Sequence, residues 1–102
     1  MTTNAKVELP LLQIETFCKK WRVREFSLFG SVLRDDFRPD SDVDVLVVFE
    51  DDAPWSLWDW SDMRDELKSA FGRDVDLVEK GALRNPYRKR AILSSYEVIY
   101  AA

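Results

Sequence analysis

Apolar residues follow helical spacing in two stretches of the chain. Residues 10–21 begin with a proline suited to a first helical turn and carry apolar side chains three or four positions apart. Residues 56–70 repeat this spacing and are followed by Gly72, a residue typical of the position after a helix. The pattern therefore predicts two amphipathic helices. Their apolar stripes consist of Leu11, Ile14, Cys18 and Trp21 in the first helix, and of Trp60, Met63, Leu67 and Ala70 in the second.

Three other stretches have the pattern of β-strands. Residues 42–49 are β-branched and almost continuously apolar, as expected of a strand that is buried on both faces. Residues 24–29 and 74–78 are shorter runs of the same kind. A short helical turn over 32–36 fits the segment between the first two strands.

The C-terminal stretch predicts a last helix over 86–100. Asn85 is a good N-cap, Pro86 suits the first helical position, and Ile92, Tyr96 and Ile99 lie at helical spacing. The order α-β-β-α-β-α then indicates a mixed α/β (α+β) fold, with a small three-stranded sheet flanked by helices. A chain of 102 residues is expected to form one domain, spanning 1–102.

Composition narrows the possible chemistry. The chain has no histidine and one cysteine, which excludes Ser-His and Cys-His catalysis, ordinary zinc sites and internal disulfides. Its three glycines fit neither of the common glycine-rich phosphate motifs. A net charge of −4 argues against extensive nucleic-acid binding, and no apolar run is long enough for a membrane helix. We therefore expect a cytoplasmic protein in which any catalysis depends on carboxylates, with a metal ion.

Three aspartates lie inside strand patterns, where a charge is costly unless it is paired or binds a metal. Asp42 and Asp44 are two residues apart, so both side chains leave the same face, about 6.6 Å apart along the strand. From there they could converge on one Mg²⁺ ion, which prefers carboxylate and phosphate oxygens. Asp76 lies in the later strand, and Asp74 is its rival for the same role.

The segment after the first strand suits phosphate binding. Gly30 permits a sharp turn and a close approach of ligand to backbone, and a helical turn beginning at Ser31 would point free N–H groups outward. Ser31 adds a hydroxyl donor. Arg34 adds a positive charge within one turn, although a surface salt bridge with Asp35 or Asp36 is an equally good interpretation of that residue.

These residues carry a resemblance to a known superfamily. Gly30-Ser31, ten residues and then Asp42-Val43-Asp44 match the G-S-x₁₀-D-x-D signature of DNA polymerase beta-like nucleotidyltransferases. The sequence of residues 29–34 and 38–47 is similar to that of the minimal nucleotidyltransferases, the MntA-type antitoxins. Asp76 falls where that family has its third carboxylate. The similarity spans roughly residues 20–100.

The resemblance implies a Mg²⁺-dependent enzyme that transfers AMP from ATP to a protein hydroxyl. Its partner would be a HEPN-domain RNase toxin, inactivated by AMPylation of a tyrosine. The implied catalytic and metal ligands are Asp42, Asp44 and Asp76, which hold two Mg²⁺ ions, with Asp76 also the general base. The implied nucleotide-binding residues are Gly30, Ser31 and Arg34. Two alternatives remain: a non-catalytic antitoxin that neutralises its toxin by binding, and an aminoglycoside-type small-molecule nucleotidyltransferase.

Two further features leave their roles open. Trp55 and Trp58 fall opposite the apolar stripe of their helix, so they either form a protein interface, in a homo- or hetero-oligomer, or cover the sheet from an irregular 51–56 segment. Basic residues near the start of the last helix oppose the helix dipole. They are either a solvated face or a site for an acidic partner, and they are Arg84, Arg88, Lys89 and Arg90.

Overall fold

The computed structural model describes residues 9–33, 38, 41–51 and 53–101 of the chain. The helices are α1 (Leu11–Lys20), α2 (Leu57–Phe71) and α3 (Pro86–Leu93), with two short 3₁₀ turns, η1 (Gly30–Leu33) and η2 (Lys80–Ala82). The strands are β1 (Val23–Phe29), β2 (Val43–Phe49), β3 (Val75–Glu79) and β4 (Tyr96–Ala101). Two of the three predicted helices and all three predicted strands are confirmed to within one or two residues. The structure begins the predicted turn at Gly30, and residues 34–36 lie outside the described part.

The four strands form one mixed sheet in the order β3-β2-β1-β4. β1 pairs antiparallel with both β2 and β4, whereas β2 and β3 are parallel and are connected through α2. The mixed α/β fold class is confirmed, and the sheet has four strands instead of the predicted three. Both faces of β2 are covered, with Val45 and Val47 in the main core and Leu46 in a second cluster, which explains its almost continuous run of apolar residues.

The predicted helix over 86–100 is wrong beyond Leu93. α3 ends there, and Tyr96–Ala101 form β4 along the edge of β1, where Tyr96 pairs with Phe29. The spacing of Ile92, Tyr96 and Ile99 fits a helix, but the segment Tyr96–Ala101 is rich in aromatic and β-branched residues that favour strands. The edge of β1 also offers unpaired backbone groups, which this segment satisfies.

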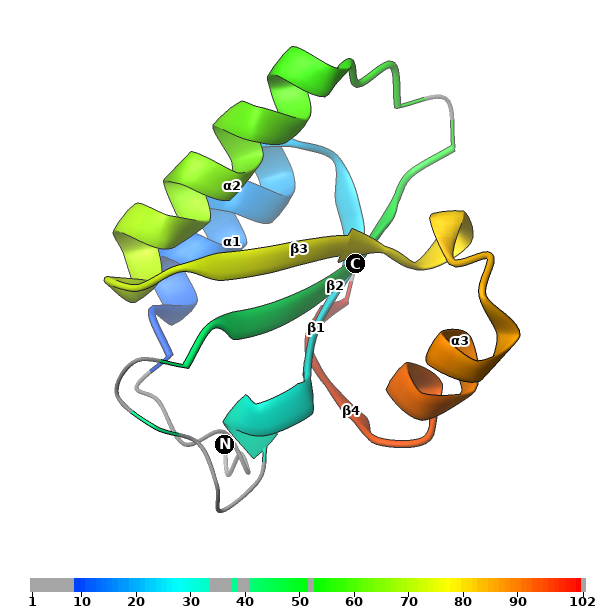
Figure 1. The fold of residues 1–102 in the computed structure, drawn as a ribbon. Helices are drawn as coiled ribbons and strands as arrows, with labels where there is room; N and C mark the ends of the chain where they lie inside the picture. Colours follow the sequence, from blue (N-terminus) through cyan, green and yellow to red (C-terminus); the bar gives the residue numbers. More distant parts are fainter. Residues whose placement is uncertain (1–8, 34–37, 39–40, 52, 102) are drawn as a thin grey trace.

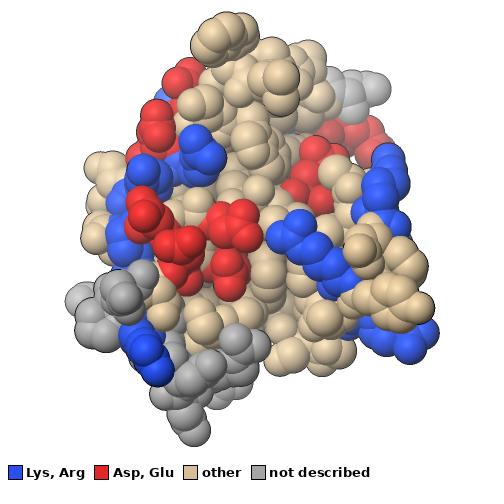
Figure 2. Space-filling view, viewed as in Figure 1, with Lys and Arg blue, Asp and Glu red and all other residues tan. Residues whose placement is uncertain are grey.

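The helices cover the two faces of the sheet unequally. α1 and α2 lie together on one face, and α3 lies on the other, beyond the ends of the strands (Figure 1). The space-filling view from the same side shows acidic side chains over the starts of β2 and β3, with basic side chains approaching them from the side of α3 (Figure 2). Acidic and basic side chains therefore face each other across the surface seen in this view.

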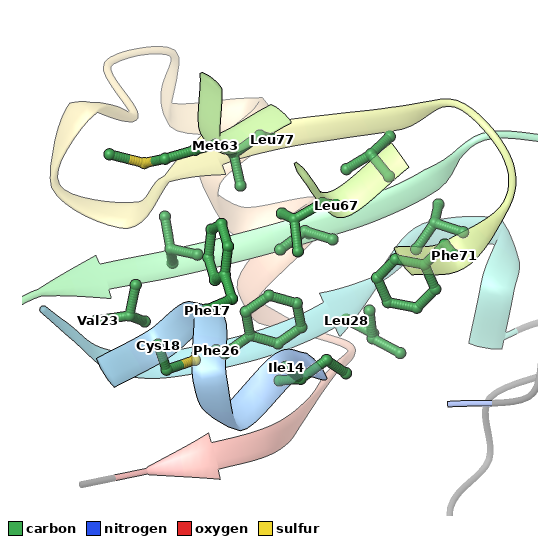
Figure 3. Packing of buried hydrophobic residues seen from close by; sticks show 14 of the residues in the cluster. Ile14, Phe17, Cys18, Val23, Phe26, Leu28, Met63, Leu67, Phe71 and Leu77 are labelled. Carbon is green, nitrogen blue, oxygen red and sulfur yellow. The ribbon is translucent and has the colours of Figure 1, made fainter. Parts of the chain in front are cut away.

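The main hydrophobic core fills the space between the sheet and the helix pair α1 and α2 (Figure 3). Phe17 of α1 contacts Phe26 of β1 edge to face, with ring centroids 6.1 Å apart. The residues of this core that the helices contribute include Ile14, Phe17, Cys18, Met63, Leu67 and Phe71. Leu11, which the sequence pattern assigned to the stripe of α1, is instead 54% exposed at the beginning of that helix.

Residues at the ends of α2 define where it begins and stops. Ser56 and Asp59 form a reciprocal capping box at its start. Gly72 ends it in the left-handed conformation, with φ of 71°, which confirms the role predicted from the sequence. None of the helices in the described part of the chain has both the length and the apolar character needed to cross a bilayer.

The two tryptophans near the start of α2 have different environments. Trp55 packs edge to face on Trp21, with centroids 5.1 Å apart, and its indole N–H donates to the Trp21 carbonyl at 2.9 Å. Trp58 is 83% exposed, as is its apolar neighbour Leu57 at 87%. Trp55 therefore covers the core, and Trp58 is the exposed aromatic residue of the pair.

Candidate active site

The parallel register of β2 and β3 brings two of the predicted site residues together. Asp44 of β2 pairs with Asp76 of β3. Paired residues of neighbouring strands have side chains on the same face of a sheet, and the strands lie about 4.8 Å apart. Asp44 is half-buried and Asp76 is exposed. The structure thus juxtaposes two carboxylates that are 32 positions apart in the sequence.

Gly30 makes room for one of these carboxylates. It follows β1 directly and has φ of +75°, a conformation that favours glycine. A Cβ atom added there would fall on Oδ2 of Asp44 and lie 3.1 Å from its Cγ. The carboxyl group of Asp44 therefore occupies the space that any other side chain at position 30 would need.

The turn after Gly30, for which the sequence predicts phosphate binding, is present as η1. Ser31 is its second residue and is half-buried, next to the Gly30–Asp44 contact. Val32 is fully buried in the main core and fixes this turn to the sheet. Arg34, Asp35 and Asp36 lie outside the described residues, so their positions do not enter the site.

Asp42 lies immediately before β2, two residues from Asp44, and is exposed. The backbone around it is held by several hydrogen bonds. The Arg73 guanidinium donates to the carbonyls of Arg38 at 3.3 Å and Ser41 at 3.4 Å, and the Val43 N–H donates to the carbonyl of Asp74 at 2.9 Å. These contacts fix the approach to β2, and so the position from which Asp42 extends.

Asp74 and Asp76 have different partners. Asp74 precedes β3 and forms an ion pair with Lys68 of α2, at 3.3 Å. Asp76 lies within β3 beside Asp44 and forms an ion pair with Arg88 of α3, at 3.7 Å. Of these two candidates, Asp76 is therefore the one that is paired with Asp44 across the two strands.

Arg88 was not among the predicted site residues. Its Nη2 atom lies 3.7 Å from Oδ2 of Asp76, and both side chains are about half exposed, at 54% and 50%. The sequence did carry a signal, because a basic residue in the first turn of a helix opposes the helix dipole. Sequence alone could not show which of the four basic residues of that region reaches an acidic side chain.

A hollow of about 1030 Å³ adjoins this pair of side chains. Asp76 and Arg88 line one part of it, and Trp55, Leu57 and Trp60 line another. It therefore connects the acidic face of the sheet with the beginning of α2, where Leu57 and Trp58 are exposed. A volume of this size is at the upper end of the roughly 300–1,000 Å³ of small-molecule sites.

The donor set of the site suits a hard divalent cation. Asp42, Asp44 and Asp76 offer only carboxylate oxygens, and the carboxyl group of Asp44 lies in the space that the missing side chain of Gly30 leaves. Mg²⁺ in proteins is commonly held by one or two carboxylates together with substrate phosphates. Within the described residues no three acidic or thiol side chains lie close enough to share a metal ion. The arrangement therefore fits a cation that arrives with a phosphate ligand better than one held by protein groups alone.

The family of the protein follows from comparison with known proteins. The model of the nucleotidyltransferase domain matches residues 12–99. The chain belongs to the nucleotidyltransferase domain family. Over 82 residues it is 38% identical to the protein adenylyltransferase MntA of Thermococcus cleftensis, a match that covers 80% of this chain and 78% of the relative. The resemblance to minimal nucleotidyltransferases that the motif indicates is thus confirmed at the family level.

Solved structures agree on the nucleotidyltransferase fold. A chain in a crystal structure of a toxin–antitoxin with AMP-PNP matches with a TM-score of 0.74 and 20% identity, over 92% of this chain and 75% of that chain. A chain from the tri-AMPylated Shewanella oneidensis HEPN toxin in complex with MNT antitoxin matches with a TM-score of 0.67 and 19% identity, over 91% and 71%. At these identities the structural matches establish the fold of this nucleotidyltransferase.

Proposed function

We propose that this nucleotidyltransferase transfers AMP from ATP to a hydroxyl group of a HEPN-domain toxin and thereby acts as its antitoxin. The observation that carries the proposal is the Asp44–Asp76 pair on adjacent parallel strands, with the Asp44 carboxyl group seated against Gly30. Support for the substrates comes from the MntA relative, which is named a protein adenylyltransferase, and from a fold neighbour solved with AMP-PNP.

Each site residue has a role in this proposal. The backbone of Gly30 and the N–H and hydroxyl groups of Ser31 bind phosphate oxygens of ATP, with Arg34 adding positive charge. Asp42 and Asp44 would hold one Mg²⁺ ion and Asp76 a second, and these ions would neutralise charge on the phosphates and ease deprotonation of the acceptor hydroxyl. Asp76 also accepts the proton, because no histidine is available to do so.

The transfer balances without any further reactant. The acceptor oxygen forms a bond to the α-phosphorus of ATP, the bond from that phosphorus to the bridging oxygen breaks, and pyrophosphate leaves with the electron pair. The acceptor proton passes to Asp76. The contribution of the chain is to align these groups and to place donors where charge develops.

The acceptor enters the site from the second face of the sheet, on which α3 lies. The hollow beside Asp76 and Arg88 leads to the exposed Leu57 and Trp58, which gives a protein partner an apolar contact next to the reaction centre. We place the reaction in the cytoplasm, where ATP is supplied and where the free buried thiol of Cys18 is in keeping with a reducing environment.

The test is intact-mass spectrometry of a HEPN-domain toxin from the same organism after incubation with this protein, ATP and Mg²⁺. We expect the mass of AMP to be added to the toxin. Asp42→Asn, Asp44→Asn and Asp76→Asn should each slow the transfer by at least about 100-fold, because each removes a ligand from the phosphate-bound cation.

Asp74→Asn is the matched control. It removes the same charge two residues from Asp76, but its partner is Lys68 on the other side of the sheet, so transfer should stay within about two-fold of the unmodified protein. Equal losses in the Asp74 and Asp76 variants would contradict the assigned site. A stable complex with no added mass would instead support an antitoxin that neutralises by binding.

A further inference from the structure

Arg88 connects two elements that are separate in the fold. Arg88 belongs to the first turn of α3, and its guanidinium group reaches Asp76 of β3 on the second face of the sheet. The separation of 3.7 Å is that of a charge pair with water access, and about half of each side chain is exposed. Within the part of the chain that the structure describes, Arg88 therefore supplies a positive charge beside a carboxylate that the proposed function assigns to a cation.

The position of Arg88 is fixed by the packing of α3. Ile92, one turn later, is buried in a second cluster with Phe29, Leu46 and Leu83. At the start of the helix, the side-chain oxygen of Asn85 accepts the backbone N–H of Arg88 at 3.1 Å. The helix thus begins and packs so that the guanidinium group extends toward β3, although a positive charge at this end opposes the helix dipole. The nearby carboxylate offsets that cost.

A guanidinium group and a divalent cation compete for the same carboxylate. Both are positively charged, so a cation that binds Asp76 repels Arg88 at contact distance. A nucleotide changes this balance, because its phosphates add ligands for the cation and give the displaced guanidinium an anionic partner of matching geometry. Asp76 and Arg88 line the same hollow and about half of each side chain is exposed, so the guanidinium group has room to leave the carboxylate by rotation of its own side chain.

We propose that Arg88 is the resident counter-ion of Asp76, which a divalent cation must displace, and that this competition couples cation binding to the arrival of nucleotide. This inference rests on the proposed function, because it takes Asp76 to be a cation ligand. Arg88 is then a positioning residue that keeps the site weakly occupied by cations until the nucleotide enters.

Mn²⁺ binding, followed by the electron paramagnetic resonance signal of the free ion, tests the proposal without any catalytic turnover. Without nucleotide, Arg88→Gln should bind Mn²⁺ roughly two- to five-fold more tightly than the unmodified protein, as the value of an exposed ion pair suggests. The factor by which AMP-PNP tightens Mn²⁺ binding should fall by at least as much. Arg88→Lys keeps a cation beside Asp76 and should restore weak binding.

Lys89→Gln is the matched control, because it removes one positive charge from the adjacent exposed position of the same helix. Equal tightening in the Arg88 and Lys89 variants would overturn the proposal, since the effect would then depend only on net charge. Tightening by Arg88→Gln that persists in an Asp76→Asn background would overturn it as well. Circular dichroism of each variant confirms that the comparison is made between folded proteins.

The same data separate this inference from the proposed function. If Asp76→Asn weakens Mn²⁺ binding in the presence of AMP-PNP but Arg88→Gln changes nothing, the cation site stands and the role of Arg88 is refuted. If Asp76→Asn has no effect on Mn²⁺ binding under either condition, the assignment of Asp76 as a cation ligand fails, and the inference fails with it.

Discussion

Replacement of Gly30 by alanine perturbs the site at a single methyl group. Gly30 has φ of +75°, and a Cβ atom there would fall on the Asp44 carboxyl group. Gly72 provides a matched control, because its φ of +71° is nearly the same and a Cβ atom there would meet nothing within 4 Å. The two alanine variants share the backbone strain, and only one of them displaces Asp44.

The structure gives the size of each effect. A left-handed backbone costs an alanine about 1–2 kcal/mol, which for a domain of this size lowers the melting temperature by about 4–8 °C per kcal/mol. In Gly30→Ala the Asp44 side chain must also leave its rotamer, at a further cost of about 0.5–1.5 kcal/mol. The two variants should therefore differ in stability by no more than about 1.5 kcal/mol.

Activity should separate the variants much more strongly. A displacement of about 1 Å in a catalytic group can reduce a rate by about 100-fold. We expect the rate of AMP transfer by Gly30→Ala to be about 10- to 100-fold lower than that of Gly72→Ala. The rate is measured by mass spectrometry of the toxin, under conditions in which chemical denaturation shows both variants to be folded. Transfer by folded Gly30→Ala within three-fold of Gly72→Ala would refute the view that Asp44 acts from the space at Gly30.

Two further predictions concern residues outside the reaction centre. Trp58→Ser should leave the melting temperature nearly unchanged and weaken toxin binding in a pull-down or calorimetric titration. Trp55→Ser should lower the melting temperature by several degrees, because the substitution removes the packing and the hydrogen bond to Trp21. Equal stability losses in the two variants would contradict this division. Burial raises the pKa of the Cys18 thiol to about 12, so almost no reactive thiolate exists at pH 8. Iodoacetamide should therefore label Cys18 only in denaturant, which peptide mass spectrometry can show. Rapid labelling of the native protein would place this residue outside the core.

The elements with strong local signals were predicted well from the sequence. The apolar stripe and the terminal glycine predicted α2, and the capping box that the structure shows at Ser56 and Asp59 agrees with where the helix begins. β2 is central in the sheet, and its continuous apolar run has no competing interpretation as an amphipathic helix. In both elements, local preference and tertiary packing favour the same structure.

The C-terminus was predicted wrongly because local spacing and tertiary pairing conflict there. The spacing of Ile92, Tyr96 and Ile99 fits a helix, whereas in β4 Tyr96 packs against the second cluster and Ile99 against the main core, on opposite faces of the sheet. What decides is the free edge of β1, whose backbone groups are satisfied by Tyr96–Ala101. A pattern read within one segment carries no information about an unpaired edge elsewhere in the chain.

The types of the site residues could be predicted, but their contacts could not. Aspartates inside apolar strands are visible as costly choices in the sequence, and the motif identifies which ones to examine. The neighbour relation of Asp44 and Asp76 depends on the register of a parallel strand pair, and the approach of Asp44 to Gly30 depends on an antiparallel pair on its other side. Neither register is encoded by the spacing of residues along one strand.

The paired carboxylates indicate a site in which stability is exchanged for binding. Like charges directly opposite each other on adjacent strands are destabilising, by about 0.2–1 kcal/mol for such pairs. Asparagine or threonine at position 76 would fold without this repulsion, so the charge of Asp76 beside Asp44 brings a cost in stability to the sheet. Arg88 reduces the repulsion from one side, but as an exposed ion pair it does so weakly. Under the proposed function, the remaining negative charge attracts a divalent cation with its nucleotide, and a stronger internal counter-ion would stabilise the sheet at the expense of that affinity.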